Sequence, residues 1–137
     1  MIQISKMDFD QMVAYAKAEL PNEACGLLAG TINEAGKVVK KVYCLTNMDH
    51  SPNHFSLSVE EQFAAIKDIR AKGYELLGNW HSHPRTDAML SDEDKRLAYD
   101  RKASYTILSL KDMNEPVLKA FCYLENVFLE EEIQMEL

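Results

Sequence analysis

The pattern of apolar positions changes along the chain, and its first part has the period of a helix. Apolar residues between positions 9 and 20 recur every three or four residues, which places them on one face of an α-helix. These residues are Phe9, Met12, Val13, Ala16 and Leu20. Ser5 or Asp8 can cap the start of this helix, and Pro21 ends it after about three turns.

Further along the chain, short apolar runs bounded by turn residues predict strands. The run 24–32 is continuously apolar and too short for a good helix, so we expect a buried strand there. The turn 34–37 joins it to a second strand, and the two form a hairpin. A short extended piece covers 54–57. The longer predicted strands are 24–32, 38–45, 75–81, 105–110, 117–123 and 127–133.

Two more helices are predicted from their capping residues. Ser58 and Glu61 have the S-x-x-E spacing of a capping box, and Gly73 ends the helix that they open. The residues expected on its inner face are Val59, Phe63, Ile66 and Ile69. Ser91 precedes three acidic residues, 92–94, which favour the start of a third helix because the helix dipole stabilises negative charge there.

Mixed strands and helices with several hairpins predict a central, mixed and largely antiparallel sheet flanked by helices, in the α/β or α+β class. The 137 residues are 47% hydrophobic and 27% charged, which is typical of a folded globular protein. A chain of this length is close to the usual size of one domain. We therefore expect a single domain spanning 1–137.

Charge and hydropathy argue against several classes of function. With 15 Lys and Arg against 22 Asp and Glu, the net charge is −7, and no basic stripe is present. This argues against nucleic acid and anionic membranes as partners. No apolar run approaches the roughly 18 residues of a membrane span, and residues 1–10 lack the pattern of a signal peptide. We expect a cytoplasmic protein, and the sequence leaves its oligomeric state open.

The chemically informative segment is 78–94, GNWHSHPRTDAMLSDED. Its His81 and His83 are two residues apart, so at the end of a strand both imidazoles lie on one face. Asp94 stands at the third position of the following helix, where it could complete a two-His, one-carboxylate zinc site whose fourth position is left to water. The competing interpretations are two exposed histidines on a surface strand and an ordinary helix cap formed by Ser91 and Asp94.

The combination of motifs resembles the JAMM (MPN+) metalloprotease family. The family pattern is an upstream Glu, then H-[ST]-H-P, then S-x-x-D after a short loop. This chain has Glu23 in E-A-C-G-L-L and H-S-H-P at 81–84, followed by Ser91 and Asp94 in S-x-x-D. Leu90 departs from the many relatives that have Pro before the Ser. The short form is similar to the small stand-alone bacterial branch, and the resemblance implies a cytidine-deaminase-like JAMM fold over essentially the whole chain.

The resemblance also implies a role for each motif residue. His81, His83 and Asp94 would hold Zn²⁺. Glu23 would contact the zinc-bound water as general base, and Ser91 would stabilise the tetrahedral oxyanion. The implied function is a zinc-dependent metallopeptidase or isopeptidase that hydrolyses an amide bond at the C-terminus of a ubiquitin-like sulfur-carrier protein. The alternative is a non-catalytic interaction scaffold of the MPN type, but scaffolds of that type lack the ligands that are present here.

Other residues near the motifs have open roles. Cys25 shares a predicted strand face with Glu23, and we expect a packed thiol, although a fourth ligand at this position would close the metal site. The three cysteines, Cys25, Cys44 and Cys122, form no disulfide framework, and we expect all of them to be buried. His50 and His54 lie in a loop and are expected mostly at the surface. Trp80 is expected in the core, opposite the ligands. The loop residues that could touch a substrate are Arg85, Asp87 and Met89.

Overall fold

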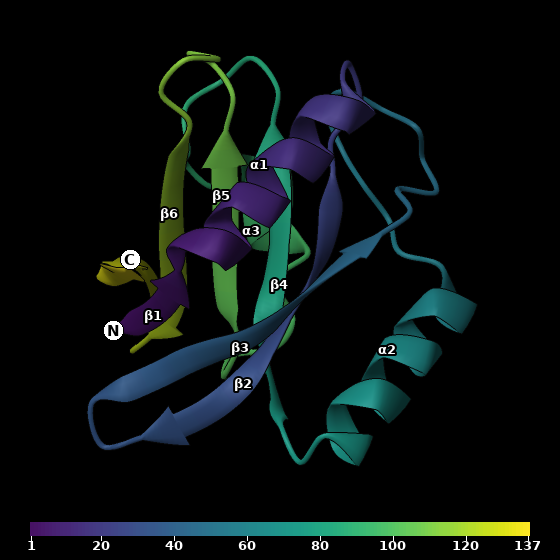
Figure 1. The fold of residues 1–137 in the computed structure, drawn as a ribbon. Coiled ribbons are helices and arrows are strands. Elements are labelled where there is room, and N and C mark those ends of the chain that lie inside the picture. The colour runs from purple at the N-terminus through teal and green to yellow at the C-terminus, as the bar shows by residue number, and fades with distance from the viewer.

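Eight strands and three helices make up the computed structural model, which describes residues 1–137 (Figure 1). The helices are α1 (Lys6–Glu19), α2 (Val59–Ala71) and α3 (Asp92–Arg96). The strands are β1 (Ile2–Ser5), β2 (Cys25–Asn33), β3 (Gly36–Leu45), β4 (Glu75–His83), β5 (Ser104–Ser109), β6 (Val117–Leu124), β7 (Val127–Glu131) and β8 (Ile133–Glu136). All three predicted helices are present, and none of them is both long and apolar enough to cross a membrane.

The strands form one mixed sheet in the order β7-β6-β5-β4-β2-β3-β1-β8. The pairs β4–β5, β3–β1 and β1–β8 are parallel, and the remaining four pairs are antiparallel. This confirms the predicted class, a mixed central sheet flanked by helices. The predicted hairpin is β2–β3, and in its turn the side chain of Asn33 accepts hydrogen bonds from the N–H groups of Ala35 and Gly36. Gly36 has a φ of +136°, which residues with a Cβ rarely adopt.

The C-terminal segment differs from the prediction. The predicted strand 127–133 is divided at Glu132, because the chain changes partners there: β7 pairs with β6, whereas β8 pairs with β1 at the other edge of the sheet. The N–H group of Ile2 donates to the carbonyl oxygen of Glu132 at 2.9 Å, so the two edges of the sheet meet at this residue. Three consecutive Glu residues, 130–132, interrupt the apolar pattern at the break, but they do not indicate that the chain changes its pairing partner there.

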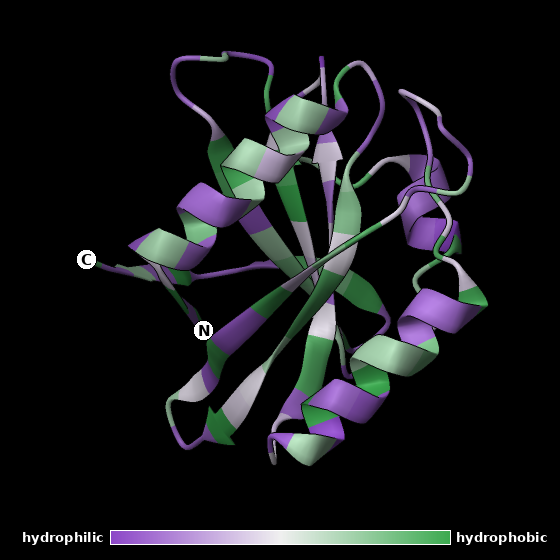
Figure 2. Cartoon of the chain, turned by 45° about the vertical axis from the view of Figure 1, so that its right-hand side comes forward, coloured by the Kyte–Doolittle hydropathy of each residue, from purple (hydrophilic) through white to green (hydrophobic).

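Helix α1 covers one face of the sheet and contributes to the larger of the hydrophobic cores (Figures 1 and 2). Ser5, one of the two predicted caps, begins the helix. Its buried residues Met12 and Ala16 belong to the same apolar cluster as Trp80 of β4. Trp80 is completely buried, as predicted, and its indole N–H donates to the carbonyl oxygen of Tyr43 at 3.1 Å.

Helix α2 covers the opposite face, and its buried side matches the prediction only in part, because Ile69 is buried as predicted whereas Val59 and Phe63 are not. Ala65 and Ile69 are buried in a cluster with residues of β2 and β3. Val59 and Phe63, predicted on the inner face, are 76% and 65% exposed. Side chains two residues apart on an α-helix point about 200° apart around its axis, so Phe63 points away from the sheet when Ala65 points toward it.

The capping box predicted for α2 has only its first half. The hydroxyl of Ser58 accepts a hydrogen bond from the N–H of Glu61 at 3.0 Å. The carboxylate of Glu61 does not return to the cap, because it accepts the N–H of Thr46 at 3.0 Å. This contact ties the start of α2 to the end of β3 and brackets the loop between them.

Candidate metal and active site

Two imidazoles project from the C-terminal end of β4, which lies between β2 and β5. The strand runs through His83, two residues further than predicted. His81 pairs directly with Cys25 of β2, and His83 presents its side chain to the same face of the sheet. Between them, Ser82 turns to the other face, where its hydroxyl accepts the N–H of Ala24 at 2.7 Å. The strand that carries both histidines is therefore held by β2 on one side and by β5 on the other.

The third candidate ligand comes from α3, which follows the loop 84–90. Ser91 is the N-cap, and its hydroxyl accepts the N–H of Asp94 at 3.0 Å. In return, Oδ2 of Asp94 accepts the N–H of Ser91 at 2.9 Å, which completes a capping box. The helix-cap interpretation is thus correct, and the same cap aims the Asp94 carboxylate at the imidazoles.

The ligand cluster, His81, His83 and Asp94, has the dimensions of a zinc site. Nε2 of His81, Nε2 of His83 and Oδ2 of Asp94 form a triangle with sides of 3.2 Å. Donor atoms around a tetrahedral Zn²⁺ with bonds of about 2.0–2.1 Å lie about 3.3 Å apart. The ligand cluster could therefore hold a metal ion, and it includes no thiol. Three protein ligands without Cys are typical of catalytic rather than structural zinc.

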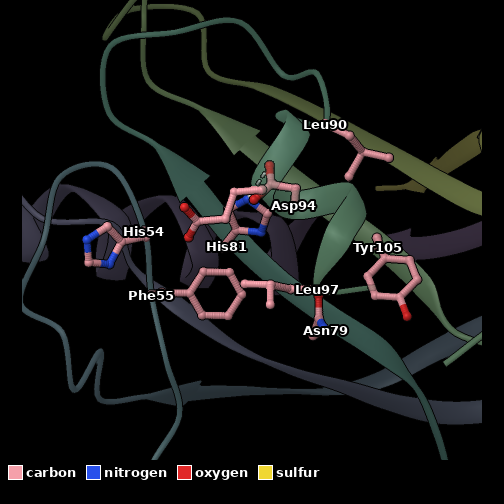
Figure 3. A pocket seen from close by; sticks show the side chains of 9 residues that line it. His54, Phe55, Asn79, His81, Leu90, Asp94, Leu97 and Tyr105 are labelled. Atoms are coloured by element: carbon pink, nitrogen blue, oxygen red, sulfur yellow. Dashed lines mark hydrogen bonds and ion pairs between the residues drawn. The ribbon is translucent and has the colours of Figure 1, made fainter. Parts of the chain in front are cut away.

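Contacts behind the imidazoles orient both rings. Nδ1 of His83 lies 2.9 Å from the carbonyl oxygen of Asp87, so Nδ1 carries the proton and Nε2 is left free to bind a metal. The ring of Phe55 stacks on that of His81, with 4.8 Å between centroids and 26° between planes (Figure 3). Nδ1 of His81 is buried without a hydrogen-bond partner. Packing therefore holds this second ring in place.

The charges of two of the three candidate ligands suit metal binding. Burial alone would raise the pKa of Asp94, but hydrogen bonds from the two imidazoles hold it well below its ordinary value. Burial lowers the pKa of His81, although Asp94 opposes the shift. Burial would also lower the pKa of His83, but its hydrogen bonds to Asp94 and to the Asp87 carbonyl raise it. Asp94 is therefore ionised and His81 neutral, the states in which they bind metals, whereas His83, with its raised pKa, gives up a proton more readily only when a metal replaces it.

Glu23 lies just before β2 and lines a hollow of about 320 Å³, which we call the Glu23 hollow, together with His83 and Ser91. The residue is 4% exposed, and its Oε1 is buried with no hydrogen-bond partner. Burial raises the pKa of Glu23 to about 8, although the nearby His83 opposes this shift. A group with such a pKa can both take up and release a proton near neutral pH.

Asn47 fixes the backbone at Glu23, and the sequence analysis did not single it out. Its side-chain amide donates to the carbonyl oxygens of Glu23 at 3.0 Å and His54 at 3.1 Å. Its Oδ1 accepts the N–H groups of Asp49 at 3.0 Å and Ser56 at 3.3 Å. In the sequence Asn47 looks like an ordinary turn residue. Its burial and its bonds on both sides of the loop identify it as the residue that organises this segment.

The loop histidines stay outside the ligand cluster. Nδ1 of His54 lies 3.0 Å from a carboxylate oxygen of Asp49, and its ring points away from His81 (Figure 3). His50 is exposed in a turn, with a φ of +46°. The expectation that both lie mostly at the surface is confirmed.

The cysteines only partly match the expectation of burial. Cys25 is fully buried, and its thiol contacts the carbonyl oxygen of Leu45 at 3.8 Å. Burial raises the pKa of Cys25 to about 12, so it is a neutral packed thiol. Cys44 and Cys122 are half-buried.

The three loop residues predicted near a substrate have different places. Arg85 lines the Glu23 hollow. Asp87 and Met89 line another hollow, and the Asp87 carboxylate pairs with Lys111 at 3.3 Å. Only Arg85 therefore has its side chain beside the candidate site.

Several relatives are similar to this chain in sequence. The CysO-cysteine peptidase of Mycobacterium tuberculosis is 29% identical, over 90% of this chain and 84% of its own length. The desampylase of Haloferax volcanii is 30% identical, over 61% of this chain and 59% of its own. The names of both proteins are those of hydrolases.

Solved structures and a family model complete the comparison. A protein from Desulfitobacterium hafniense has a TM-score of 0.92 at 47% identity, covering 99% of this chain and 93% of its own. A JAB1/MPN domain protein from Archaeoglobus fulgidus has a TM-score of 0.61 at 21% identity, covering 98% of each chain, and so shares the fold. Residues 5–122 match the model of prokaryotic homologs of the JAB domain. The chain therefore belongs to the prokaryotic JAB family, which confirms the resemblance drawn from its motifs.

Proposed function

We propose that this protein is a zinc-dependent peptidase that hydrolyses an amide bond at the C-terminus of a ubiquitin-like sulfur-carrier protein. The observation that carries the proposal is the triangle of ligand atoms, 3.2 Å on each side, that borders the hollow containing Glu23 and Ser91. This arrangement combines a set of metal ligands, a buried acid and a hydroxyl group. Together they meet the requirements of metal-assisted amide hydrolysis.

The ligand cluster would hold Zn²⁺ through three protein atoms and leave one position for water or a substrate oxygen. When bound, the ion supplies a Lewis acid that lowers the pKa of a water to about 7 and polarises a carbonyl group. The carbonyl of Asp87 keeps the proton of His83 on Nδ1, away from the ion. The capping box fixes the orientation of the Asp94 carboxylate.

Glu23 would move the proton. Its Oε1 is buried and makes no hydrogen bond, so no contact within the protein competes for this oxygen. Because burial raises its pKa to about 8, it is a stronger base than an ordinary carboxylate. In the proposed reaction Oε1 takes a proton from the attacking water and passes it to the leaving nitrogen.

Ser91 would stabilise the oxyanion. Its oxygen accepts the N–H of Asp94, which leaves the hydroxyl proton free to be donated. Its place in the same hollow as Glu23 allows that proton to point at a substrate bound there. Loss of one such donor typically lowers the rate about 10²–10³-fold.

The substrate class is inferred from the relatives. The name CysO-cysteine peptidase describes a peptidase that acts on a cysteine adduct, and it belongs to a relative that aligns with 90% of this chain. A carrier protein that ends in Gly-Gly, extended by an added amino acid, is the corresponding substrate here. Glycine residues need no side-chain pocket, so an extended tail can pass close to the ligand cluster.

The proposal is tested with purified protein and a carrier that ends in Gly-Gly-Cys. We expect zinc-loaded protein to release the terminal residue and leave Gly-Gly, as measured by mass spectrometry of the intact carrier. EDTA should stop the reaction, and added zinc should restore it. Glu23→Gln should retain zinc but lose turnover by orders of magnitude, because the substituted amide cannot accept the proton.

Glu75→Gln is the matched control, since Glu75 is an exposed acid at the opposite end of β4, and it should leave turnover unchanged. The alternative function, a non-catalytic scaffold, predicts carrier binding without any change in its mass. That outcome, or full activity of Glu23→Gln, would refute the proposed peptidase.

A further inference from the structure

Two hollows of different character adjoin the ligand cluster. The first, which we call the narrow hollow, has a volume of about 40 Å³ and an apolar wall (Figure 3). The apolar residues that line it are Phe55, Leu90, Leu97 and Tyr105. The second is the Glu23 hollow, about 320 Å³, which has no hydrophobic residue in its lining. A substrate that crosses the ligand cluster therefore meets an apolar slot on one side and a polar space on the other.

The position of Glu23 indicates which part of the substrate takes which hollow. In the proposed function Glu23 returns a proton to the leaving nitrogen, so it must lie on the side of the leaving group. Glu23 lines the polar hollow and does not line the narrow one. The leaving group accordingly occupies the Glu23 hollow, and the narrow hollow is left for the glycines of the carrier.

Arg85 is the only Lys or Arg that lines either hollow. Its side chain is exposed and makes no hydrogen bond or ion pair, whereas the neighbouring Lys111 is paired with Asp87 at 3.3 Å. A free guanidinium presents a planar fork of donors that matches a carboxylate. In a chain with a net charge of −7, this one cation lies in the hollow that receives the leaving group.

The loop that carries Arg85 is held just after this residue by one contact from β5 and one from β4. The hydroxyl of Ser109 donates to the carbonyl oxygen of Thr86 at 2.6 Å. Nδ1 of His83 donates to the carbonyl oxygen of Asp87 at 2.9 Å. The backbone at Arg85 is therefore held at a fixed place relative to His83, as a specificity residue requires.

We propose that Arg85 binds the α-carboxylate of a single amino acid that is the leaving group, so that the enzyme removes one C-terminal residue from its carrier. This inference rests on the proposed function. Water adds across the amide bond: its hydroxyl joins the carbonyl carbon of the last glycine, the C–N bond breaks, the glycine stays on the carrier as a carboxylate, and the amino acid leaves as an ammonium ion. An isopeptide on a lysine side chain has no carboxylate beside its leaving nitrogen and gains nothing from Arg85.

The test compares two carriers that differ in one charge. One ends in Gly-Gly-Ala with a free carboxylate, and the other ends in Gly-Gly-Ala amide; alanine avoids any contact between a thiol and zinc. We expect wild-type enzyme to prefer the free acid. Arg85→Ala should lower kcat/KM for the free acid about 10- to 100-fold, mainly through KM, and should leave the amide nearly unchanged.

Two further variants complete the test. Lys111→Ala is the matched control, because it removes another cation that lines a hollow together with Arg85, and it should keep the preference for the free acid. Arg85→Lys should retain part of the preference. Equal cleavage of both carriers by wild type, or an equal loss on both with Arg85→Ala, would overturn the role of Arg85 while the peptidase stands. If zinc-loaded wild type cleaves neither carrier, the proposed function itself fails.

Discussion

The two faces of β4 treat buried polar groups in opposite ways. On the face covered by α1, Trp80 donates to the carbonyl of Tyr43, and the hydroxyl of Ser82 accepts a backbone N–H. At the site on the other face, Nδ1 of His81 and Oε1 of Glu23 are buried without a partner. On β4 itself the polar groups of the first face are therefore paired within the chain, although Oγ1 of Thr106 on the neighbouring β5 is also buried without a partner; the site on the other face has two such groups.

An unpaired buried polar group costs about 1–3 kcal/mol, so the second face is not arranged for stability. Groups of this kind concentrate where a protein binds or transforms a ligand. Substitutions on the Trp80 face should therefore lower stability and leave metal binding unchanged. Substitutions on the His81 face should abolish metal binding and leave the stability of the metal-free protein nearly unchanged.

The largest effect is expected from removing two ligands together. His81→Ala combined with His83→Ala leaves Asp94 alone and should abolish stoichiometric zinc binding. Because a catalytic metal contributes several kcal/mol, kcat/KM on the carrier should fall by at least about 10³-fold. In EDTA the variant should unfold at nearly the same urea concentration as the EDTA-treated wild type. Metal analysis and urea unfolding measure both; one zinc retained per chain would contradict the ligand assignment.

The next effect concerns the opposite face of the same strand. Trp80→Ala should lower the free energy of unfolding by about 3–5 kcal/mol, because it leaves a cavity beneath α1. Trp80→Phe, which keeps most of the ring volume, should lose less. Urea unfolding measures the loss, and the folded fraction should bind zinc as wild type does. A Trp80→Ala protein that is stable but free of zinc would break the comparison.

A smaller effect is expected at Asn47, which supports the site without touching the ligand cluster. Asn47→Ala leaves buried backbone groups unpaired, including the carbonyl of Glu23, and should cost about 1–3 kcal/mol. We expect kcat to fall while zinc stoichiometry stays at wild-type level. Asn114→Ala, in an exposed turn, serves as the control. Unchanged kcat would show that Asn47 does not position Glu23.

The smallest effect, measured for a change of one pH unit, is a pH dependence of stability in the metal-free protein. Burial raises the pKa of Glu23 from 4.5 to about 8. Between these values the folded state binds more protons than the unfolded state, so stability falls as pH rises, by at most about 1.4 kcal/mol per pH unit. The contribution is fully present below pH 4.5 and lost above pH 8. Thermal unfolding in EDTA should show this slope in wild type and not in Glu23→Gln; identical slopes would contradict the shifted pKa.

The parts of the site that could be predicted from sequence are those set by local geometry. The spacing of His81 and His83 on a strand fixes a shared face, and the S-x-x-D cap fixes Asp94 relative to Ser91. Glu23 is 58 residues from His81, and only the family resemblance linked the two. Its present position in the same hollow as His83 follows from the antiparallel pairing of β2 with β4.

The features that escaped prediction depend on tertiary partners. The buried side of α2 includes Ala65 beside the predicted Ile69 but not Val59 or Phe63, and this choice depends on how the helix meets the sheet. Asn47 has the composition of a turn, and its role exists only because the loop folds over Glu23. In each case the amino-acid pattern allowed more than one arrangement, and contacts far along the chain selected one.

The meeting of the two sheet edges has a consequence for how the protein is assembled. β1 pairs with β8 along its whole length, so residues 2–5 find their outer neighbour only after residues 133–136 have been synthesised. Until then, one side of β1 is an unpaired edge, which invites association with other chains. A truncation that removes 133–136 would leave every residue of the candidate site in place. Such a protein should aggregate through the exposed edge of β1 although its site is intact.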